Sequence, residues 1–453
     1  MQRRIVVVGA GAGGALVCAR LLPHLEAGSE LTLVSRGPTP GQGLAYGTKD
    51  PDHLLNVRAE GMSAFPEEPG HFVEYLKSRG FTSDDFPGQE HRPAEALGKA
   101  FVPRALYAEY LGAVLDERAQ VTEANYRFIQ DETHAVRCHE GAYRVELGHH
   151  EAIDADYVVL AIGNLPPKTP PVLRDLPDDG RYLADPWSGH LSEIAPEEDV
   201  LLLGCSLTAI DVVMTLMRGA RTGKIRLRSR HGLLPRPHRL ASSTPSPAWE
   251  LEEPTAKRLS KTIGGLAKAA GEEWRGAIDS LRPRTVELWQ SLPWSERDRV
   301  FRRLSAYWDT HRHRIPEWVA AKLDGFQTSG SIDIAAARLT SVTPTGNGFR
   351  VEAKRHDGTC ETFHVDRIVN CTGSQTDYRA AAIPVLDAVT EAGLAEYDPL
   401  GFGLIVDSHG RTKENEGIFA IGPLCRGCRL ETTAMPEIRR QAADISAAIM
   451  EGK

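Results

Sequence analysis

Three glycines near the N-terminus have the spacing of a dinucleotide-binding turn. Gly9, Gly11 and Gly14 form the pattern GxGxxG between a valine-rich run at 4–8 and a helical pattern at 15–25. The first glycine permits a tight turn, the second lets backbone amides approach a pyrophosphate, and the third lets helix and strand pack closely. We therefore predict that a dinucleotide binds at Gly9, Gly11, Ala12, Gly13 and Gly14.

A second turn of this kind follows the strand pattern at 199–204. Ser206 replaces the middle glycine, but its hydroxyl can donate to a phosphate, and Thr208 lies in the first helical turn. Ser229 and Arg230 end the next strand, where an acidic residue would favour NADH and a cation favours the 2'-phosphate of NADPH. We predict NADPH, bound by Gly204, Ser206, Leu207, Thr208, Ser229 and Arg230. The alternative for Arg230 is an ordinary surface charge.

The strands around these turns predict the domain organisation. The strand patterns at 156–164 and 366–374 end at Gly163 and Gly373 and resemble crossings between two domains. We expect an α/β fold with two Rossmann-like dinucleotide-binding domains, the plan of a flavoprotein that uses FAD and NAD(P)H. The expected parts are an FAD-binding domain at 1–185 and 336–453, an NADPH-binding domain at 186–335, and a helical insertion at 245–328.

The expected insertion contains six of the seven tryptophans: Trp249, Trp274, Trp289, Trp294, Trp308 and Trp318. We expect them to build a small core of its own. The alternative is a lid or substrate wall, in which the basic run at 311–314 faces an anionic group. A charge run is more often a solvated face.

Longer strings extend over nearly the whole chain: GQGLAYGTKDPDHLLNVRAEGMS (41–63), FVPRALYAEYL (101–111), ADPW (184–187), SRHGLLPRPH (229–238), NCTG (370–373) and ETTAMPEIRRQA (431–442). Together they resemble the YdhS-type FAD/NAD(P)-binding protein family, which is similar to flavin-dependent N-oxygenases. The resemblance implies an NAD(P)H-dependent flavin monooxygenase of the N-hydroxylating type, acting on a small amine or amino-acid-like substrate. NADPH would reduce FAD, and one atom of oxygen would reach the nitrogen.

The resemblance also implies that the loop at 41–63 lies along FAD, with Tyr46, His53, Leu55, Asn56 and Met62 as its neighbours. Arg104, within FVPR, needs an anionic or planar partner, so Arg104 and Asn56 are candidates beside the reacting centre. The alternatives are a tight surface turn for the loop, core packing for Met62, and an internal ion pair with a carboxylate for Arg104.

The sequence departs from the usual FAD pattern at two places. Ser35 replaces the acidic residue that would hold the ribose, and Arg36 beside it is expected to stack on adenine or meet a phosphate. Gly422 is followed by Pro423 in place of aspartate. Thr432 and Thr433 open the last helix, whose positive end would face the flavin pyrimidine. Glu431 and Glu437 flank that turn, either as flavin ligands or as helix caps.

Cys425 and Cys428 form a CxxC pair next to this helix. A dithiol beside a flavin would make the chain a thiol/disulfide oxidoreductase, and the alternative is a plain pair of loop cysteines. A metal site would need two further ligands, so none is predicted. A flavin-binding sensor without catalysis is a third possibility.

Composition narrows the class of partner to a small-molecule substrate. The net charge of -8 argues against nucleic acid as a partner, and no apolar run reaches the length of a membrane span. The seven cysteines are mostly far apart, which is typical of a reducing cytoplasm. The sequence indicates no oligomeric state.

Overall fold

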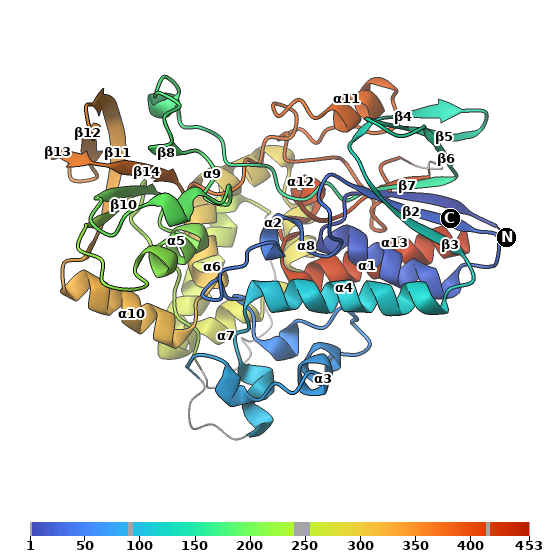
Figure 1. Ribbon diagram of the computed structural model, residues 1–453, viewed down its shortest axis with the longest axis horizontal. Coiled ribbons are helices and arrows are strands. Elements are labelled where there is room, and N and C mark those ends of the chain that lie inside the picture. The colour runs from blue at the N-terminus through green and yellow to red at the C-terminus, as the bar shows by residue number, and fades with distance from the viewer. Residues whose placement is uncertain (1, 89–93, 240–253, 414–416, 453) are drawn as a thin grey trace.

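A computed structural model describes residues 2–88, 94–239, 254–413 and 417–452, and its chain is built on two separate sheets, one parallel and one mixed (Figure 1). The first sheet has the order β15, β7, β1, β2, β3: Ile418–Ala420, Tyr157–Leu160, Arg4–Val8, Glu30–Ser35 and Asn125–Gln130. All neighbouring strands in it are parallel. The valine-rich run predicted as the first strand is its central strand, as expected for a parallel sheet that is covered on both faces.

Helices from both ends of the chain cover one face of the first sheet. Figure 1 shows α1 (Ala12–Leu21), α4 (Arg104–Val121) and α13 (Met435–Glu451) side by side beneath it. The other face packs against α11 (Pro384–Glu391) and a small sheet of β4, β5 and β6, which span Thr133–His139, Ala142–Leu147 and Ile153–Ala155. The N-terminal and C-terminal parts of the chain therefore share one core.

The second sheet has the order β13, β12, β11, β10, β9, β14, β8. Its strands are Cys360–Val365, Gly348–Arg355, Ile332–Thr345, Ile225–Ser229, Val200–Leu203, Arg367–Asn370 and Tyr182–Leu183. The strands from β11 to β8 are parallel, and β11, β12 and β13 are joined as antiparallel neighbours. The helices α5 (Leu207–Leu216) and α10 (Glu317–Thr328) bury their apolar residues against it. The fold is thus the expected α/β fold with two Rossmann-like units.

The second sheet continues past residue 335, where the sequence placed a domain boundary. Pairing of β14 with β9 and of β12 with β11 adds residues 348–370 to this sheet. Strand partners are not encoded locally, so the sequence pattern could not assign these strands to a sheet. From the pairing we propose that the second unit runs from 182 to 370. The two segments expected to cross between the domains, which follow β7 and β14, are joined by an antiparallel β-bridge between Pro167 and Ser374.

The insertion expected at 245–328 contains α6 (Ala256–Ala270), α7 (Trp274–Asp279), α8 (Thr285–Ser291) and α9 (Trp294–Arg312), followed by α10, which packs against the second sheet. Trp289 is buried in a cluster of this insertion, and Trp274 and Trp308 pack on a second one, as expected. Trp294 and Trp318 differ from that expectation, because they pack against the cores of the first and second units. Trp249 lies outside the described residues.

Three short helices complete the secondary structure that matters for the site: α2 (Gly43–Tyr46), α3 (His71–Ser78) and α12 (Arg426–Arg429). Among the residues described, no helix combines the length and the apolar character that a bilayer crossing requires.

Candidate cofactor and substrate site

The turn after β1 has no room for side chains at its first and third glycines. Gly9 has a φ of +107°, and its N–H donates to the carbonyl of Val34 at 2.7 Å. A Cβ at Gly9 would lie 2.3 Å from the carbonyl oxygen of Ala161, and a Cβ at Gly14 would lie 1.9 Å from that of Gly9. The turn therefore leaves the backbone at the start of α1 open to a phosphate.

The predicted residues of the first unit meet at the carboxyl edge of its sheet. The strands β1, β2, β7 and β15 are parallel neighbours, so the residues that follow them share this edge: Gly9 to Gly14, Ser35 and Arg36, Gly163, and Gly422 with Pro423. The loop at 41–63 lies on the same turn, because the N–H of Gly41 donates to the carbonyl of Ala10 at 2.8 Å. This is where a parallel α/β sheet binds a dinucleotide.

The segment before α13 brings a buried hydroxyl to this edge. Thr432 is fully buried, and among the described residues its Oγ1 has no hydrogen-bond partner. The carbonyl of Thr432 lies next to Gly422, whose N–H donates to Gln441 of α13 at 3.0 Å. The helix begins at Met435, so Thr432 and Thr433 precede it rather than open it. An orphaned buried hydroxyl beside a glycine turn fits a bound polar group such as FAD.

Arg36 already has a carboxylate nearby. Its side chain is 77% exposed, and its Nη1 lies 3.7 Å from Glu132. A solvated pair of this kind contributes little binding energy, so Glu132 balances the charge of Arg36 without fixing its side chain.

Part of the loop at 41–63 packs in the core. Tyr46, Leu55 and Met62 are buried, and the Tyr46 ring lies 4.8 Å from that of Tyr107. The hydroxyl of Tyr107 donates to the carbonyl of Met62 at 2.9 Å. Met62 therefore packs in the core, which is the alternative that the sequence left open for it. Asn56 is half-buried.

Arg104 and His53 join the two units. Arg104 lies 2.7 Å from Asp211 of α5, and His53 Nε2 lies 2.9 Å from the hydroxyl of Thr215 on the same helix. Burial raises the pKa of Asp211, which Arg104 opposes, and burial lowers the pKa of His53. Arg104 therefore forms an internal ion pair, which is the alternative that the sequence left open. Asp211 matches the charge of Arg104.

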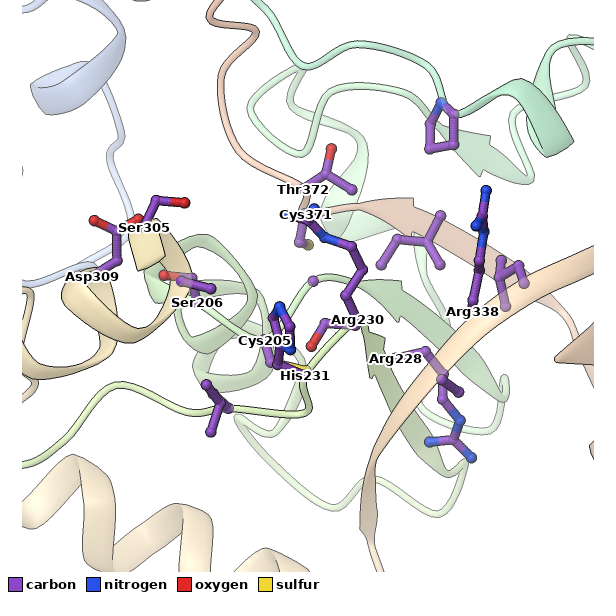
Figure 2. Close-up of a pocket in the computed structure, with 18 of the residues that line it drawn as sticks. Cys205, Ser206, Arg228, Arg230, His231, Ser305, Asp309, Arg338, Cys371 and Thr372 are labelled. Atoms are coloured by element: carbon purple, nitrogen blue, oxygen red, sulfur yellow. The ribbon is translucent and has the colours of Figure 1, made fainter. Parts of the chain in front are cut away.

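The second unit has a pocket of about 500 Å³ at the carboxyl edge of its sheet (Figure 2). Gly204, Ser206, Ser229 and Arg230 all line it, as predicted from the second turn. Leu207 and Thr208 lie in the first turn of α5, and Gly373 follows the pocket residue Thr372. A Cβ at Gly204 would lie 2.2 Å from the carbonyl oxygen of Cys371, so this turn is as tight at its first position as the turn after β1.

One end of the pocket is cationic. Arg230 and Arg338 are exposed there, and neither has an ion-pair partner in the described part of the chain. Arg228 beside them is buried, and its charge is matched by Asp333 and Glu361, each at 2.7 Å. Sequence reasoning missed Arg338, because its strand β11 is remote from the turn in sequence. Two unmatched guanidinium groups fit a phosphate.

Ser229 stabilises the turn that follows β10 at this end of the pocket. Its hydroxyl accepts a hydrogen bond from the N–H of Gly232 at 2.9 Å, which closes a turn after β10. His231 lines the pocket next to Arg230, and its ring lies 5.4 Å from that of Tyr307 on α9. The helical insertion thus closes over the second unit.

The opposite end of the pocket is formed by α9, through Ser305, Ala306, Asp309 and Thr310. The insertion therefore forms part of the pocket wall in addition to having a core of its own. Asp309 was not predicted from the sequence. Its side chain is half-exposed and lines the pocket, and desolvation by the surrounding protein raises the pKa of its carboxyl to about 6.

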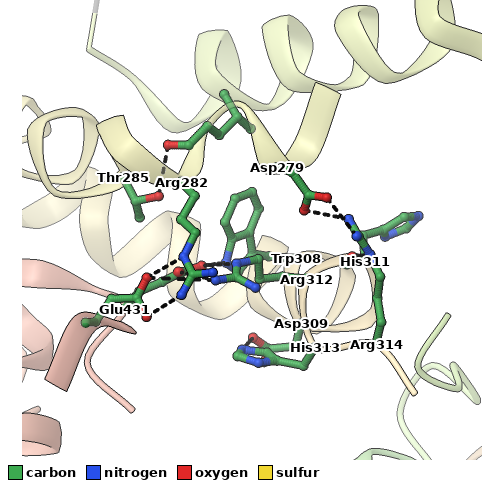
Figure 3. A network of polar contacts seen from close by, with 12 residues as sticks. Asp279, Arg282, Thr285, Trp308, Asp309, His311, Arg312, His313, Arg314 and Glu431 are labelled. Atoms are coloured by element: carbon green, nitrogen blue, oxygen red, sulfur yellow. Dashed lines mark hydrogen bonds and ion pairs between the residues drawn. The ribbon is translucent and has the colours of Figure 1, made fainter. Parts of the chain in front are cut away.

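The basic run at 311–314 is tied into the protein (Figure 3). Arg312 Nε lies 3.1 Å from Glu431, which also accepts from the indole N–H of Trp308 at 3.1 Å. Arg282 binds Glu437 at 2.6 Å. Glu431 and Glu437 are thus partners of arginines from the insertion, rather than caps of the last helix.

The remaining members of the run also have partners. Arg314 lies 2.9 Å from Asp279, and His311 Nδ1 lies 2.8 Å from the carbonyl of Tyr307. The expectation of a solvated face is wrong for Arg312 and Arg314, whose side chains are largely buried.

Cys425 and Cys428 are buried and unpaired. Cys425 donates to the carbonyl of Ala420 at 3.2 Å, and Cys428 lies 3.7 Å from that of Leu404. Burial raises the pKa of Cys425 to about 12 and also raises the pKa of Cys428. Thiols held in this way are poor nucleophiles, so the geometry argues against the dithiol alternative. In the described ranges, no group of three metal-ligating side chains is assembled.

Comparison with known proteins supports this architecture. Residues 6–165 match the model of a family described as FAD-NAD(P)-binding. A search of curated proteins finds no match to the chain.

Solved structures with a similar fold span the whole chain. The cadaverine monooxygenase DfoA of Erwinia amylovora, solved with FAD, has a TM-score of 0.68 at 13% identity, covering 100% of this chain and 95% of its own. The ornithine N-hydroxylase KtzI of Kutzneria sp. 744 was solved with reduced FAD, NADP⁺ and L-ornithine. It has a TM-score of 0.65 at 15% identity, covering 100% of this chain and 99% of its own. The bacillithiol disulfide reductase of Staphylococcus aureus has 0.59 at 12%, covering 100% of both chains. At these identities the similarity establishes the fold.

Proposed function

We propose that the protein is an NADPH-dependent FAD monooxygenase that hydroxylates the nitrogen of a small amine or amino-acid-like substrate. The observation that carries the proposal is the pocket of the second unit, which has two unmatched arginines at one end and a carboxylate at the other. A disulfide reductase would need reactive thiols at the site, and Cys425 and Cys428 are buried with raised pKa values. The similarity to amine-hydroxylating enzymes over the whole chain supports the same choice.

The residues at the first edge would hold FAD. The turn from Gly9 to Gly14 offers backbone N–H groups to the pyrophosphate, and the unpartnered hydroxyl of Thr432 offers one polar contact more. Bound FAD would supply hydride acceptance and oxygen activation. The match of residues 6–165 to an FAD-NAD(P)-binding family supports this assignment.

The residues of the second pocket would hold NADPH. Ser206 immediately precedes α5 and lies where a pyrophosphate would sit. Arg230 and Arg338 would bind the 2'-phosphate, which NADH lacks. The wall formed by α9 would exclude water from the reacting end of the pocket.

The test is a product assay with the purified full chain loaded with FAD. Cadaverine, L-ornithine, L-lysine and L-aspartate are supplied separately with NADPH in air. We expect NADPH oxidation, oxygen uptake and formation of an N-hydroxylated product to rise together with one of these amines. Oxidation of NADPH that is coupled to reduction of a disulfide, with no N-hydroxylated product from any amine, would overturn the proposal. NADPH oxidation that none of these compounds stimulates would favour the sensor alternative.

Finer assignments belong to the same proposal. Membership of the YdhS-type family is supported by the strings at 41–63 and 431–442. A cytoplasmic location is supported by the unpaired state of all seven cysteines.

A further inference from the structure

One carboxylate faces the pocket at the end remote from its arginines. Asp309 is the single acidic side chain among the described residues that line the pocket. Figure 2 shows Asp309 and Ser305 on one side of Ser206, with Arg228 and Arg338 on the other. The pocket therefore has an anionic end and a cationic end.

The position of Asp309 follows from the geometry of α9. Successive residues of an α-helix are about 100° apart, so residues four apart lie on nearly the same face. Phe301 of α9 contacts Phe402, with ring centroids 4.2 Å apart, and Arg312 contacts Glu431. Ser305, Ala306, Asp309 and Thr310 line the pocket. Asp309 thus lies on α9 between two residues that contact the C-terminal segment of the first unit, which carries the proposed FAD contacts.

The groups around Asp309 leave its carboxylate without a strong partner. His313 Nε2 is 3.6 Å away, but burial and neighbouring arginines lower the pKa of His313 to about 3, so it is neutral at pH 7. Arg426 and Glu431 act on Asp309 electrostatically with opposite signs. Among the described residues, no hydrogen-bond donor reaches the Asp309 carboxylate. A carboxylate of this kind gains most from a ligand that brings its own positive charge.

We propose that Asp309 binds an ammonium group of the substrate, an inference that rests on the proposed function. The nitrogen to be hydroxylated must be neutral to act as a nucleophile, so the group at Asp309 is a second ammonium that does not react. The substrate class is therefore a diamine or an amino acid with two basic nitrogens. Ser305, at the same end of the pocket, provides a hydroxyl that can accept a further hydrogen bond.

The competing occupant of this end is NADPH itself. A ribose hydroxyl or the carboxamide of the nicotinamide could donate to Asp309 in the same pocket. The two occupants differ in charge, because the amine is a cation and the nicotinamide end of NADPH is not. Removing the charge of Asp309 while keeping its shape therefore separates them.

The experiment measures binding to the FAD-loaded protein without turnover. Cadaverine, pentylamine and NADP⁺ are titrated separately by calorimetry into wild type, Asp309→Asn, and Asp298→Asn as a matched control. Asp298 lies on the same helix, pairs with Arg302 at 2.8 Å and does not line the pocket. We expect wild type to prefer cadaverine over pentylamine, and Asp309→Asn to lose about 10- to 100-fold in cadaverine affinity. Pentylamine affinity, NADP⁺ affinity and Tm should change little.

Two outcomes overturn the proposal. One is a wild-type protein that binds cadaverine no better than pentylamine, and the other is an Asp309→Asn protein that loses NADP⁺ affinity while its amine binding is unchanged. Failure of the proposed function is distinct, because it shows as absent N-hydroxylated product while the effect of Asp309→Asn on cadaverine binding persists.

Discussion

The turn after β1 and the turn after β9 use glycine for the same steric reason at their first position. In each, the missing side chain makes room for a carbonyl oxygen that follows the neighbouring strand, from Ala161 beside Gly9 and from Cys371 beside Gly204. The third position differs, because Gly14 of the first turn corresponds to Ala209 of the second, which is fully buried.

The charges around the two turns differ more than their backbones. Each second strand ends in Ser-Arg, but Arg36 lies beside Glu132, whereas Arg230 has an unmatched neighbour in Arg338. The comparison teaches that the two units share a backbone turn, and that the charges near each turn are set by side chains from outside it.

The largest difference between the units lies in their helices. Leu16 of α1 and Asp211 of α5 occupy equivalent positions in the sequence, counted from Gly9 and Gly204. Asp211 is paired with Arg104, whereas leucine carries no charge. We expect Arg104→Met to lower the free energy of unfolding by about 3–5 kcal/mol, because Asp211 is left buried and unpaired. Urea unfolding at pH 7 measures this. Arg104→Met/Asp211→Leu, which copies the first unit, should regain most of the loss, and a double variant as unstable as the single one would contradict the comparison.

The next largest effect concerns the third glycine. Gly14→Ala places a Cβ 1.9 Å from the carbonyl oxygen of Gly9, so we expect a loss of about 1–3 kcal/mol in stability and a lower FAD content after purification. The Tm and the ratio of flavin to protein report both. Gly13→Ala is the matched control, because the atoms nearest to its Cβ belong to the flexible side chain of Ile421, at 3.3 Å. Equal behaviour of the two variants would show that the first turn is as relaxed as the second.

The charge difference predicts a change of coenzyme preference. Arg230→Gln/Arg338→Gln should raise the KM for NADPH by about 10- to 100-fold while the KM for NADH changes little, because charge-assisted hydrogen bonds to the 2'-phosphate are lost. Arg36→Gln is the control from the first unit and should leave both values unchanged. Equal losses for NADPH and NADH would mean that the arginines bind the pyrophosphate or adenine instead.

The sequence was sufficient for the parts of the site that depend on local pattern. The glycine spacing after β1 and β9 and the Ser229-Arg230 pair identified one edge of each sheet, because turns and strand ends are encoded by neighbouring residues. Other parts of the site depend on contacts between segments far apart in the chain. They are the pairing of β14 with β9, the position of Arg338 in the pocket, and the part of the pocket wall that α9 forms. Such contacts leave no local signal.

Single side chains were the least predictable part. Arg104 and Met62 fitted a cofactor loop by resemblance, but their partners are Asp211 and Tyr107. Asp309 carried no signal, since an aspartate on a helix rich in charged residues is ordinary until the helix face it occupies is known. The role proposed for Asp309 rests on its position in the wall of the pocket.

The smallest expected effect concerns the cysteines. Cys425 and Cys428 are buried at the first edge, whereas Cys138 and Cys360 are exposed. We expect Cys425→Ala/Cys428→Ala to cost about 1 kcal/mol of stability per site and to leave product formation at the wild-type rate, because buried cysteines act as small apolar residues. In native protein a thiol reagent should label the exposed pair first. A variant that keeps its flavin but loses product formation would mean that the first edge works through its thiols, and the two units would then differ in chemistry as well as in charge.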